Sequence, residues 1–149
     1  MELLKSVVVG LGNIGMGYDY TKDGGNVLTH AQSFHLHPDF QLVAGVDPSS
    51  EKRTLFEKKF SAPSYLSLED FRDESSVPDV AAIAVPSSHH KDVFEQISIL
   101  GVKNIICEKP MGASFSEARK INSISQKYYV NTLINYIRRF DPGVLQIKT

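Results

Sequence analysis

Residues 7–15 read VVVGLGNIG and predict a strand that runs into a glycine-rich turn. The three consecutive valines predict a buried β-strand, and the glycines at positions 10, 12 and 15 follow it in the pattern G-x-G-x-x-G. Glycine is common, so this pattern alone is a weak signal for dinucleotide binding. It gains weight when a strand precedes it, a helix follows it and an acidic residue ends the next strand.

The size and charge of the chain exclude several classes of partner. With 149 residues the chain has the length of about one domain. Its 16 Lys and Arg residues against 17 Asp and Glu residues give a net charge of −1, which does not favour binding to nucleic acid or to an anionic membrane. No apolar run approaches the ~20 residues of a membrane span. A single cysteine, Cys107, forms no internal disulfide, so we expect a reducing, cytoplasmic setting.

Strand and helix patterns alternate along the chain. Continuous apolar runs predict further strands that are buried on both faces of a parallel sheet, at residues 42–46, 80–85, 105–107 and 129–137. Helices are predicted between these strands at residues 49–60 and 67–71. Two more helices are predicted from apolar residues at helical spacing: Val93, Ile97 and Leu100 in the first, and Phe115, Ala118, Ile121, Ile124 and Tyr128 in the second. The alternation predicts an α/β fold with a doubly wound parallel sheet of the Rossmann type.

Each glycine of the turn has its own predicted task. Gly10 permits the tight turn after the strand, Gly12 lets the backbone approach a pyrophosphate, and Gly15 lets the following helix pack closely on the strand. We expect the backbone amides at the helix start, at Asn13 and Ile14, to face the phosphates.

Residues 17–28, GYDYTKDGGNVL, interrupt this helix and are interpreted as an inserted loop. In Rossmann units the acidic residue that binds the ribose hydroxyls lies about 20 residues after the glycines. Asp47 ends the second strand and lies 32 residues after Gly15, or 20 when the 12 inserted residues are left out. Its carboxylate favours NAD over NADP because it repels a 2′-phosphate, although Lys52 and Arg53 one helical turn later soften that preference.

Two further polar clusters follow predicted strands. They read Pro86-Ser87-Ser88-His89-His90 after residues 80–85 and Glu108-Lys109-Pro110 after residues 105–107. Taken singly, a histidine at a helix start is more often a cap or a solvated residue than a catalyst. Because the carboxyl ends of parallel strands meet at one edge of the sheet, we expect both clusters to converge with Asp47 on one crevice.

Three histidines, His30, His35 and His37, lie close together in the sequence. His30 and His35 do not share a helical face and no fourth ligand is evident, so we expect solvated histidines and no metal site.

With these motifs the sequence resembles the N-terminal half of the glucose-fructose oxidoreductase, inositol dehydrogenase and MocA family. The resemblance rests on GLGNIG after the first strand, His30 in the first helix, VD at the end of the second strand, Pro86 followed four residues later by His90, then CEKP, and finally YIRRFDP. EKP is the most diagnostic of these motifs. The resemblance implies an oxidoreductase with NAD as cofactor and a sugar, cyclitol or sugar nucleotide as substrate.

The resemblance also implies roles for individual residues. Lys109 would lie beside the nicotinamide and the substrate hydroxyl as the catalytic residue. Its ammonium would polarise the reacting oxygen and assist proton transfer while hydride moves to or from nicotinamide carbon 4. Pro86, Ser87, His90 and Glu108 would surround the cofactor.

Members of this family continue beyond R-F-x-P into a second α+β domain that supplies further catalytic groups, typically an Asp and a His. We therefore expect residues 1–140 to form the dinucleotide-binding domain, residues 141–149 to be a stub of the second domain, and the rest of that domain to be absent. Such a chain would bind the cofactor without normal turnover. Exposure of the strand at 129–137 would favour homo-oligomers through apolar surface or edge pairing.

Two other function classes remain open at this point. A non-catalytic module that senses NAD(H) would share the cofactor site but would have no use for Lys109. A methyltransferase also combines a glycine turn with an acidic end of the second strand, but it would bind S-adenosylmethionine and gives EKP no role.

Overall fold

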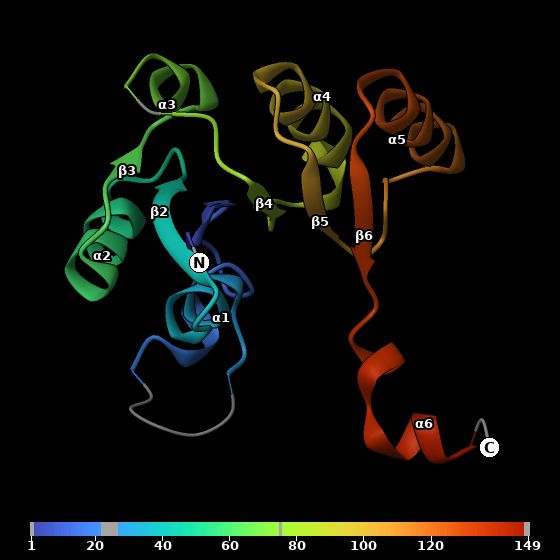
Figure 1. Ribbon diagram of the computed structural model, residues 1–149, viewed down its shortest axis with the longest axis horizontal. Coiled ribbons are helices and arrows are strands. Elements are labelled where there is room, and N and C mark those ends of the chain that lie inside the picture. Colours follow the sequence, from blue (N-terminus) through green and yellow to red (C-terminus); the bar gives the residue numbers. More distant parts are fainter. Residues whose placement is uncertain (1, 22–26, 75, 148–149) are drawn as a thin grey trace.

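Six parallel strands form one sheet in the computed structural model, which describes residues 2–21, 27–74 and 76–147. The sheet order is β3-β2-β1-β4-β5-β6 (Figure 1). The strands are β1 (Leu4–Val9), β2 (Phe40–Val46), β3 (Ser64–Tyr65), β4 (Val80–Ile83), β5 (Asn104–Glu108) and β6 (Asn131–Asn135). The chain starts at the centre and winds first to one edge and then to the other, which confirms the doubly wound Rossmann-type sheet.

The last strand, β6, is shorter than the predicted strand at residues 129–137. Tyr129 adopts a left-handed backbone with φ of 54° and ends the preceding helix, so β6 begins only at Asn131. After Asn135 the chain leaves the sheet and turns into the 3-10 helix η3 (Ile137–Phe140). The two-residue strand β3 has no apolar run and was not predicted.

Helices cover both faces of the sheet (Figure 1). α1 (His30–Leu36) and α2 (Ser50–Phe60) pack on one face, and α3 (Leu68–Glu74), α4 (His90–Leu100) and α5 (Phe115–Tyr128) pack on the other. The short helices η1 (Gly17–Asp19) and η2 (Ser87–His89) lie in loops, and α6 (Pro142–Ile147) ends the described chain. None of the helices in the described ranges combines the length and the apolar character needed to cross a bilayer.

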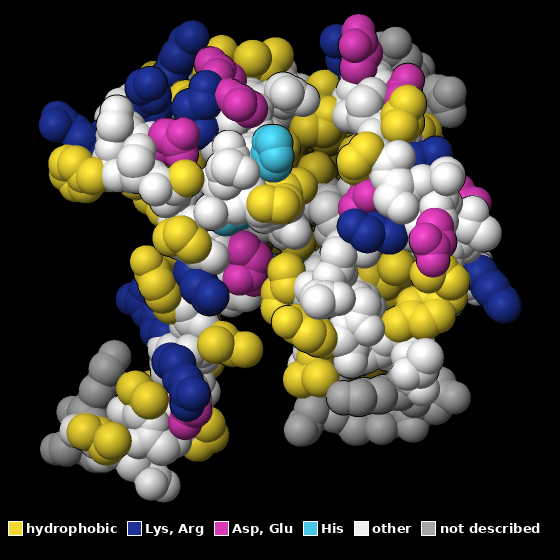
Figure 2. All heavy atoms as spheres, turned by 180° about the vertical axis from the view of Figure 1, so that it is seen from behind, with side chains coloured by type: hydrophobic (Ala, Val, Ile, Leu, Met, Phe, Trp, Pro, Cys, Tyr) yellow, Lys and Arg dark blue, Asp and Glu magenta, His cyan; other side chains and the backbone are white. Residues whose placement is uncertain are grey.

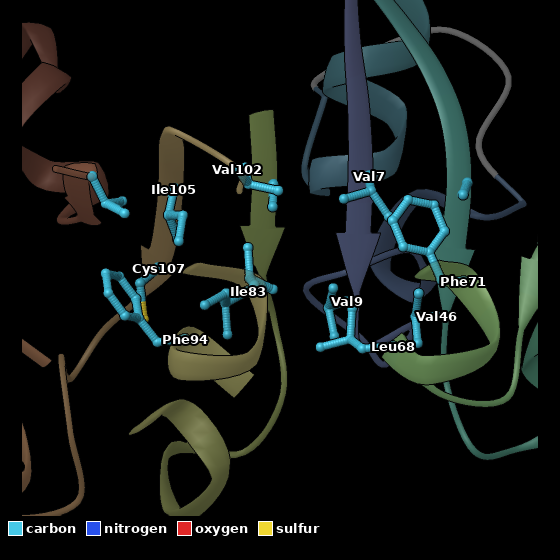
Figure 3. Packing of buried hydrophobic residues seen from close by; sticks show 14 of the residues in the cluster. Val7, Val9, Val46, Leu68, Phe71, Ile83, Phe94, Val102, Ile105 and Cys107 are labelled. Atoms are coloured by element: carbon cyan, nitrogen blue, oxygen red, sulfur yellow. The ribbon is translucent and has the colours of Figure 1, made fainter. Parts of the chain in front are cut away.

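The valines of β1 divide between the two layers of the core. Val7 and Val9 face α3, α4 and α5, and Figure 3 shows them beside Leu68 and Phe71 of α3. Val8 points to the opposite face and packs with residues of α1 and α2. All three are at most 4% exposed, as predicted for a central strand buried on both sides. By contrast, Phe115 does not join the core as its helical face suggested: it is the first residue of α5 and is 79% exposed.

The first helix is split by the segment after the glycine turn. His30 N–H donates to Ile14 O at 3.2 Å and Ala31 N–H donates to Gly15 O at 2.9 Å. If residues 17–28 were left out, the partners of each bond would be four residues apart, which is the α-helical spacing. α1 therefore stacks on the turn after Gly12 as one interrupted helix. Residues 22–26 of the intervening segment lie outside the described residues.

Candidate functional site

The glycine turn follows β1 and packs against the backbone just after the neighbouring central strand, β4. Gly10 has a φ of 95°, and a Cβ at this position would lie 2.7 Å from the backbone of Ala84 and Val85. Only glycine fits such a close approach at a positive φ. Gly10 N–H also donates to Val46 O at 2.8 Å, which ties the turn to the end of β2.

Gly12 and Gly15 face different surroundings. A Cβ on Gly15 would lie 1.9 Å from Gly10 O, so the turn packs directly on the end of β1. A Cβ on Gly12 would meet no atom within 4 Å. Within the described part of the chain, the backbone N–H groups of Gly12, Asn13 and Ile14 donate to no protein acceptor. The turn thus offers unpaired donors to open space, which is the arrangement that binds phosphate groups.

A cleft of about 920 Å³ opens at this turn, beyond the carboxyl ends of β1, β2 and β4. Six of the residues predicted to bind a cofactor line it: Gly10, Gly12, Asn13, Ile14, Asp47 and Pro86. The cleft lies where the sheet order reverses, because β1 is flanked by β2 on one side and by β4 on the other. Open α/β sheets bind ligands at this switch point, and the volume is in the range of small-molecule sites.

Asp47 is only 5% exposed and braces the turn with its carboxylate. Its Oδ2 accepts a hydrogen bond from Leu11 N–H at 2.8 Å, and its Oδ1 accepts one from Ser49 N–H at 2.9 Å. A carboxylate has about four acceptor positions, so lone pairs remain for ligand hydroxyls. Asp47 is therefore both a structural brace and a candidate ribose ligand.

The two cations after Asp47 have different partners. Lys52 Nζ lies 3.5 Å from Asp47 Oδ2 and lines the cleft. Arg53 Nη1 donates to Asp47 O at 2.8 Å and to Pro48 O at 3.0 Å, so its guanidinium satisfies the backbone at the end of β2. Lys52 is therefore the cation placed to reduce the repulsion between Asp47 and a 2′-phosphate.

His90 lies behind the loops rather than in the cleft. It is 1% exposed, with Nδ1 2.9 Å from Pro110 O and Nε2 3.0 Å from Val85 O. The ring connects the loop after β4 to the loop after β5. The neighbouring His89 lines the cleft instead, and Ser87 stands half-buried at the start of η2. The sequence motif located this loop but did not show which histidine faces the ligand side.

Glu108 is the centre of a buried polar network. Its Oε1 accepts hydrogen bonds from His30 Nε2 at 2.8 Å and from Asn135 Nδ2 at 2.6 Å. Burial raises the pKa of Glu108, but the hydrogen bonds from His30 and Asn135 outweigh burial and hold the pKa below its ordinary value. The interpretation of His30 as solvated is therefore wrong, because the fold brings it to a carboxylate 78 residues away. His35 and His37 are exposed, as expected.

Lys109 follows this network at the carboxyl end of β5 with an exposed side chain. Cys107, two residues earlier, is fully buried; burial raises its pKa to about 12, and the charge of Glu108 adds to the rise. The protonated thiol is thus a core group. In the described part of the chain, no three or more His, Cys, Asp or Glu side chains are arranged to hold a metal ion.

Comparison with known families agrees with this geometry. Residues 4–136 match the family model GFO_IDH_MocA, which describes an oxidoreductase family with an NAD-binding Rossmann fold. The chain belongs to the Gfo/Idh/MocA oxidoreductase family. It carries the NAD-binding domain of that family.

Relatives within the Gfo/Idh/MocA family are considerably longer. The rhizopine catabolism protein MocA of Rhizobium meliloti is 39% identical over 75 residues, which are 50% of this chain and 23% of that protein. The WlbA dehydrogenase of Bordetella pertussis, solved with NADH and UDP-GlcNAcA, superposes with a TM-score of 0.84 at 19% identity, covering 99% of this chain and 41% of its own. The scyllo-inositol dehydrogenase of Lactobacillus casei, solved with NAD(H) and scyllo-inositol, gives 0.81 at 18% identity, with 99% and 40% covered. These distant structures share the fold, and this chain spans about 40% of their length.

Proposed function

We propose that this chain is the NAD-binding half of an enzyme that transfers hydride between nicotinamide and a hydroxyl of a sugar, cyclitol or sugar nucleotide. One observation supports it above all: unpaired amides, the open space at Gly12 and the carboxylate of Asp47 share one cleft. The substrate class is supported by the polyhydroxylated ligands of the solved neighbours, scyllo-inositol and a UDP-sugar.

In this proposal the chain binds the cofactor at two points. The amides of Gly12, Asn13 and Ile14 hold the pyrophosphate, and Asp47 accepts hydrogen bonds from the adenosine ribose. NAD is favoured over NADP because a 2′-phosphate would meet the Asp47 carboxylate, which Lys52 at 3.5 Å only partly neutralises. When bound, the nicotinamide supplies the hydride acceptor or donor.

Lys109 is proposed as the catalytic residue because it presents an exposed ammonium at the carboxyl edge of the sheet. Its charge would polarise the substrate oxygen and assist proton transfer from it. The buried Glu108 fixes the preceding backbone, and His90 holds the following loop through Pro110 O. Pro86 and Ser87 remain proposed cofactor contacts.

The cofactor assignment is tested by calorimetric titration of NADH and NADPH against the wild type and Asp47→Asn. Asparagine keeps the shape of the side chain but removes the charge. We expect the wild type to prefer NADH, and the variant to bind NADH about tenfold more weakly while its affinity for NADPH is kept or rises. Glu51→Gln removes an exposed charge outside the cleft and should leave both affinities unchanged. Binding of neither nucleotide by the wild type would refute the assignment.

Catalysis is tested separately from binding. The protein used is this chain joined after Thr149 to a substrate domain of the kind found in the family. Lys109→Ala should lower substrate-dependent NADH formation by about 10²–10⁴-fold and leave NADH affinity nearly unchanged. Lys103→Ala, near the opposite end of β5, is the matched control. If no substrate supports NADH formation, the alternative of an NAD(H)-sensing module is favoured instead.

We further propose that the protein is cytoplasmic and forms a homo-oligomer. Cys107 is the only cysteine and is buried, which is compatible with a reducing cytoplasm. Exposed apolar side chains at and after β6 favour a homo-oligomer.

A further inference from the structure

Among the described residues of the segment that splits the first helix, Tyr18 reaches the cleft. Tyr18 lines the cleft together with Asn13 and Lys52, and it is 55% exposed. Its backbone N–H donates to Asn13 O at 2.9 Å. Tyr18 is therefore hydrogen-bonded to the turn that carries the unpaired amides, and its exposed ring is available to a ligand.

The residue after Tyr18 closes the segment on itself. Asp19 is 2% exposed, and its carboxylate accepts three hydrogen bonds from the last residue of the segment and from the residue that follows it. These come from Leu28 N–H at 2.7 Å, Thr29 N–H at 3.0 Å and the Thr29 hydroxyl at 2.7 Å. A buried carboxylate with three donors fixes the local backbone.

Helix α2 holds the same residues from outside the segment. Lys59 Nζ donates to Asp19 O at 2.7 Å and to Tyr20 O at 2.9 Å. The Tyr20 hydroxyl donates to Leu55 O at 3.2 Å. Met16, two residues before Tyr18, is 2% exposed. Tyr18 is thus an exposed aromatic residue between anchored neighbours, which presents a ring to the cleft at low entropic cost.

The charges around the cleft indicate what Tyr18 would bind. Lys52 is the one lysine or arginine among the described residues that line the cleft, and Asp47 lies 3.5 Å from its ammonium. A second carboxylate, Asp92, also lines the cleft. A pyrophosphate on the glycine turn would therefore depend on neutral donors, and a phenol hydroxyl is such a donor. We propose that Tyr18 is a cofactor-binding residue whose hydroxyl donates a hydrogen bond to a pyrophosphate oxygen, an inference that rests on the proposed function.

The test is titration of NADH and of ADP-ribose against the wild type, Tyr18→Phe and Tyr18→Ala. ADP-ribose keeps the pyrophosphate and lacks the nicotinamide. We expect Tyr18→Phe to weaken both ligands by about tenfold, and Tyr18→Ala to weaken them at least as much. Tyr129→Phe, at an 85% exposed position after α5 and outside the cleft, is the matched control and should bind like the wild type.

The outcomes separate this inference from the proposed function. If the wild type binds NADH and both Tyr18 variants bind it equally well, the inference is overturned and the proposed function stands. If only Tyr18→Ala loses affinity, the ring rather than the hydroxyl makes the contact, and the inference is likewise overturned. If NADH is weakened but ADP-ribose is not, the pyrophosphate is not the partner. A wild type that binds neither ligand overturns both proposals.

Discussion

Gly12 and Gly15 stand three residues apart in the same turn and are glycines for different reasons. At Gly15 the space for a Cβ is taken by Gly10 O, so the requirement comes from the fold. At Gly12 the space is open, so nothing in the fold itself forbids a side chain there. We therefore propose that the glycine at position 12 leaves room for a ligand that approaches from outside the protein.

Alanine substitution separates these two requirements. Gly15→Ala should lower the free energy of unfolding by about 1–3 kcal/mol, because the turn must move away from β1. Gly12→Ala should change it by less than about 1 kcal/mol. Urea unfolding followed by circular dichroism measures both. Equal losses in the two variants would contradict the assignment of different roles.

The network of Glu108, His30 and Asn135 predicts a pH dependence of stability. Because the folded-state pKa of Glu108 lies below its ordinary value of 4.5, ionised Glu108 contributes stability that is fully present above pH 4.5. That contribution is lost as the pH falls through the lowered pKa, since the proton binds more tightly to the unfolded chain. Glu108 should therefore contribute to the loss of stability on the acid side of the pH profile.

Glu108→Gln tests this dependence by urea unfolding over a range of pH. At neutral pH the variant should be less stable by about 1–3 kcal/mol, because His30 and Asn135 lose their charged acceptor. Below pH 4.5 the difference from the wild type should shrink. Glu51→Gln, at an exposed position in the first turn of α2, is the control and should parallel the wild type. A constant deficit at all pH values would argue against an ionised Glu108.

At the scale of elements, the first helix is divided by residues 17–28 yet keeps its hydrogen-bond register across the division. The bonds from His30 to Ile14 and from Ala31 to Gly15 are those of one continuous helix. We therefore expect the sheet and the glycine turn to form without the intervening segment, which is anchored by its own Asp19 and by Lys59 of α2.

Deletion of residues 17–28, which joins Met16 to Thr29, should leave a folded protein. The hydrogen bonds of Asp19 are lost, but a long connection is removed, so we expect a free energy of unfolding within about 2 kcal/mol of the wild type. Far-ultraviolet circular dichroism and cooperative thermal unfolding measure this. Loss of cooperative unfolding would show that the segment is part of the core structure.

Local patterns predicted the elements well, and contacts between distant elements explain what they missed. The continuous apolar run of Val7, Val8 and Val9 predicts a strand, and the helical spacing of Val93 and Ile97 predicts a helix, so both elements follow from the sequence. β3 has no such signal because it pairs with β2 through only two residues. The partner of His30 could not be read from the sequence, since it depends on how α1 meets the end of β5.

In the whole molecule, β6 is an edge strand of the sheet and none of its residues is fully buried. Beyond β6, η3 and α6 project from the body, with hydrophobic side chains on their surface (Figure 2). Ile137 is 71% exposed and Phe140 is 65% exposed, and Leu133 on β6 itself is 41% exposed. Apolar side chains beside an open strand edge favour association with another chain.

The 149-residue chain should therefore self-associate at high concentration. The double substitution Ile137→Asp and Phe140→Asp places charges on this surface and should shift the chain to a monomer. Leu36→Asp, at a 58% exposed position at the end of α1, introduces the same charge elsewhere and should not. Size-exclusion chromatography with light scattering measures the mass. A strict monomer for the wild type would contradict this prediction.

The proposed function requires NADH to bind in the cleft where the order of the sheet reverses. The most direct test is calorimetric titration of NADH into the wild type and Gly12→Ala, with thermal unfolding of both. We predict one NADH site in the wild type and its loss in Gly12→Ala, because the added methyl occupies the space that the pyrophosphate needs. The melting temperature of the variant should stay within about 4 °C of the wild type. A wild type that does not bind NADH, or a Gly12→Ala variant that binds it equally well, would contradict an NAD site at this turn.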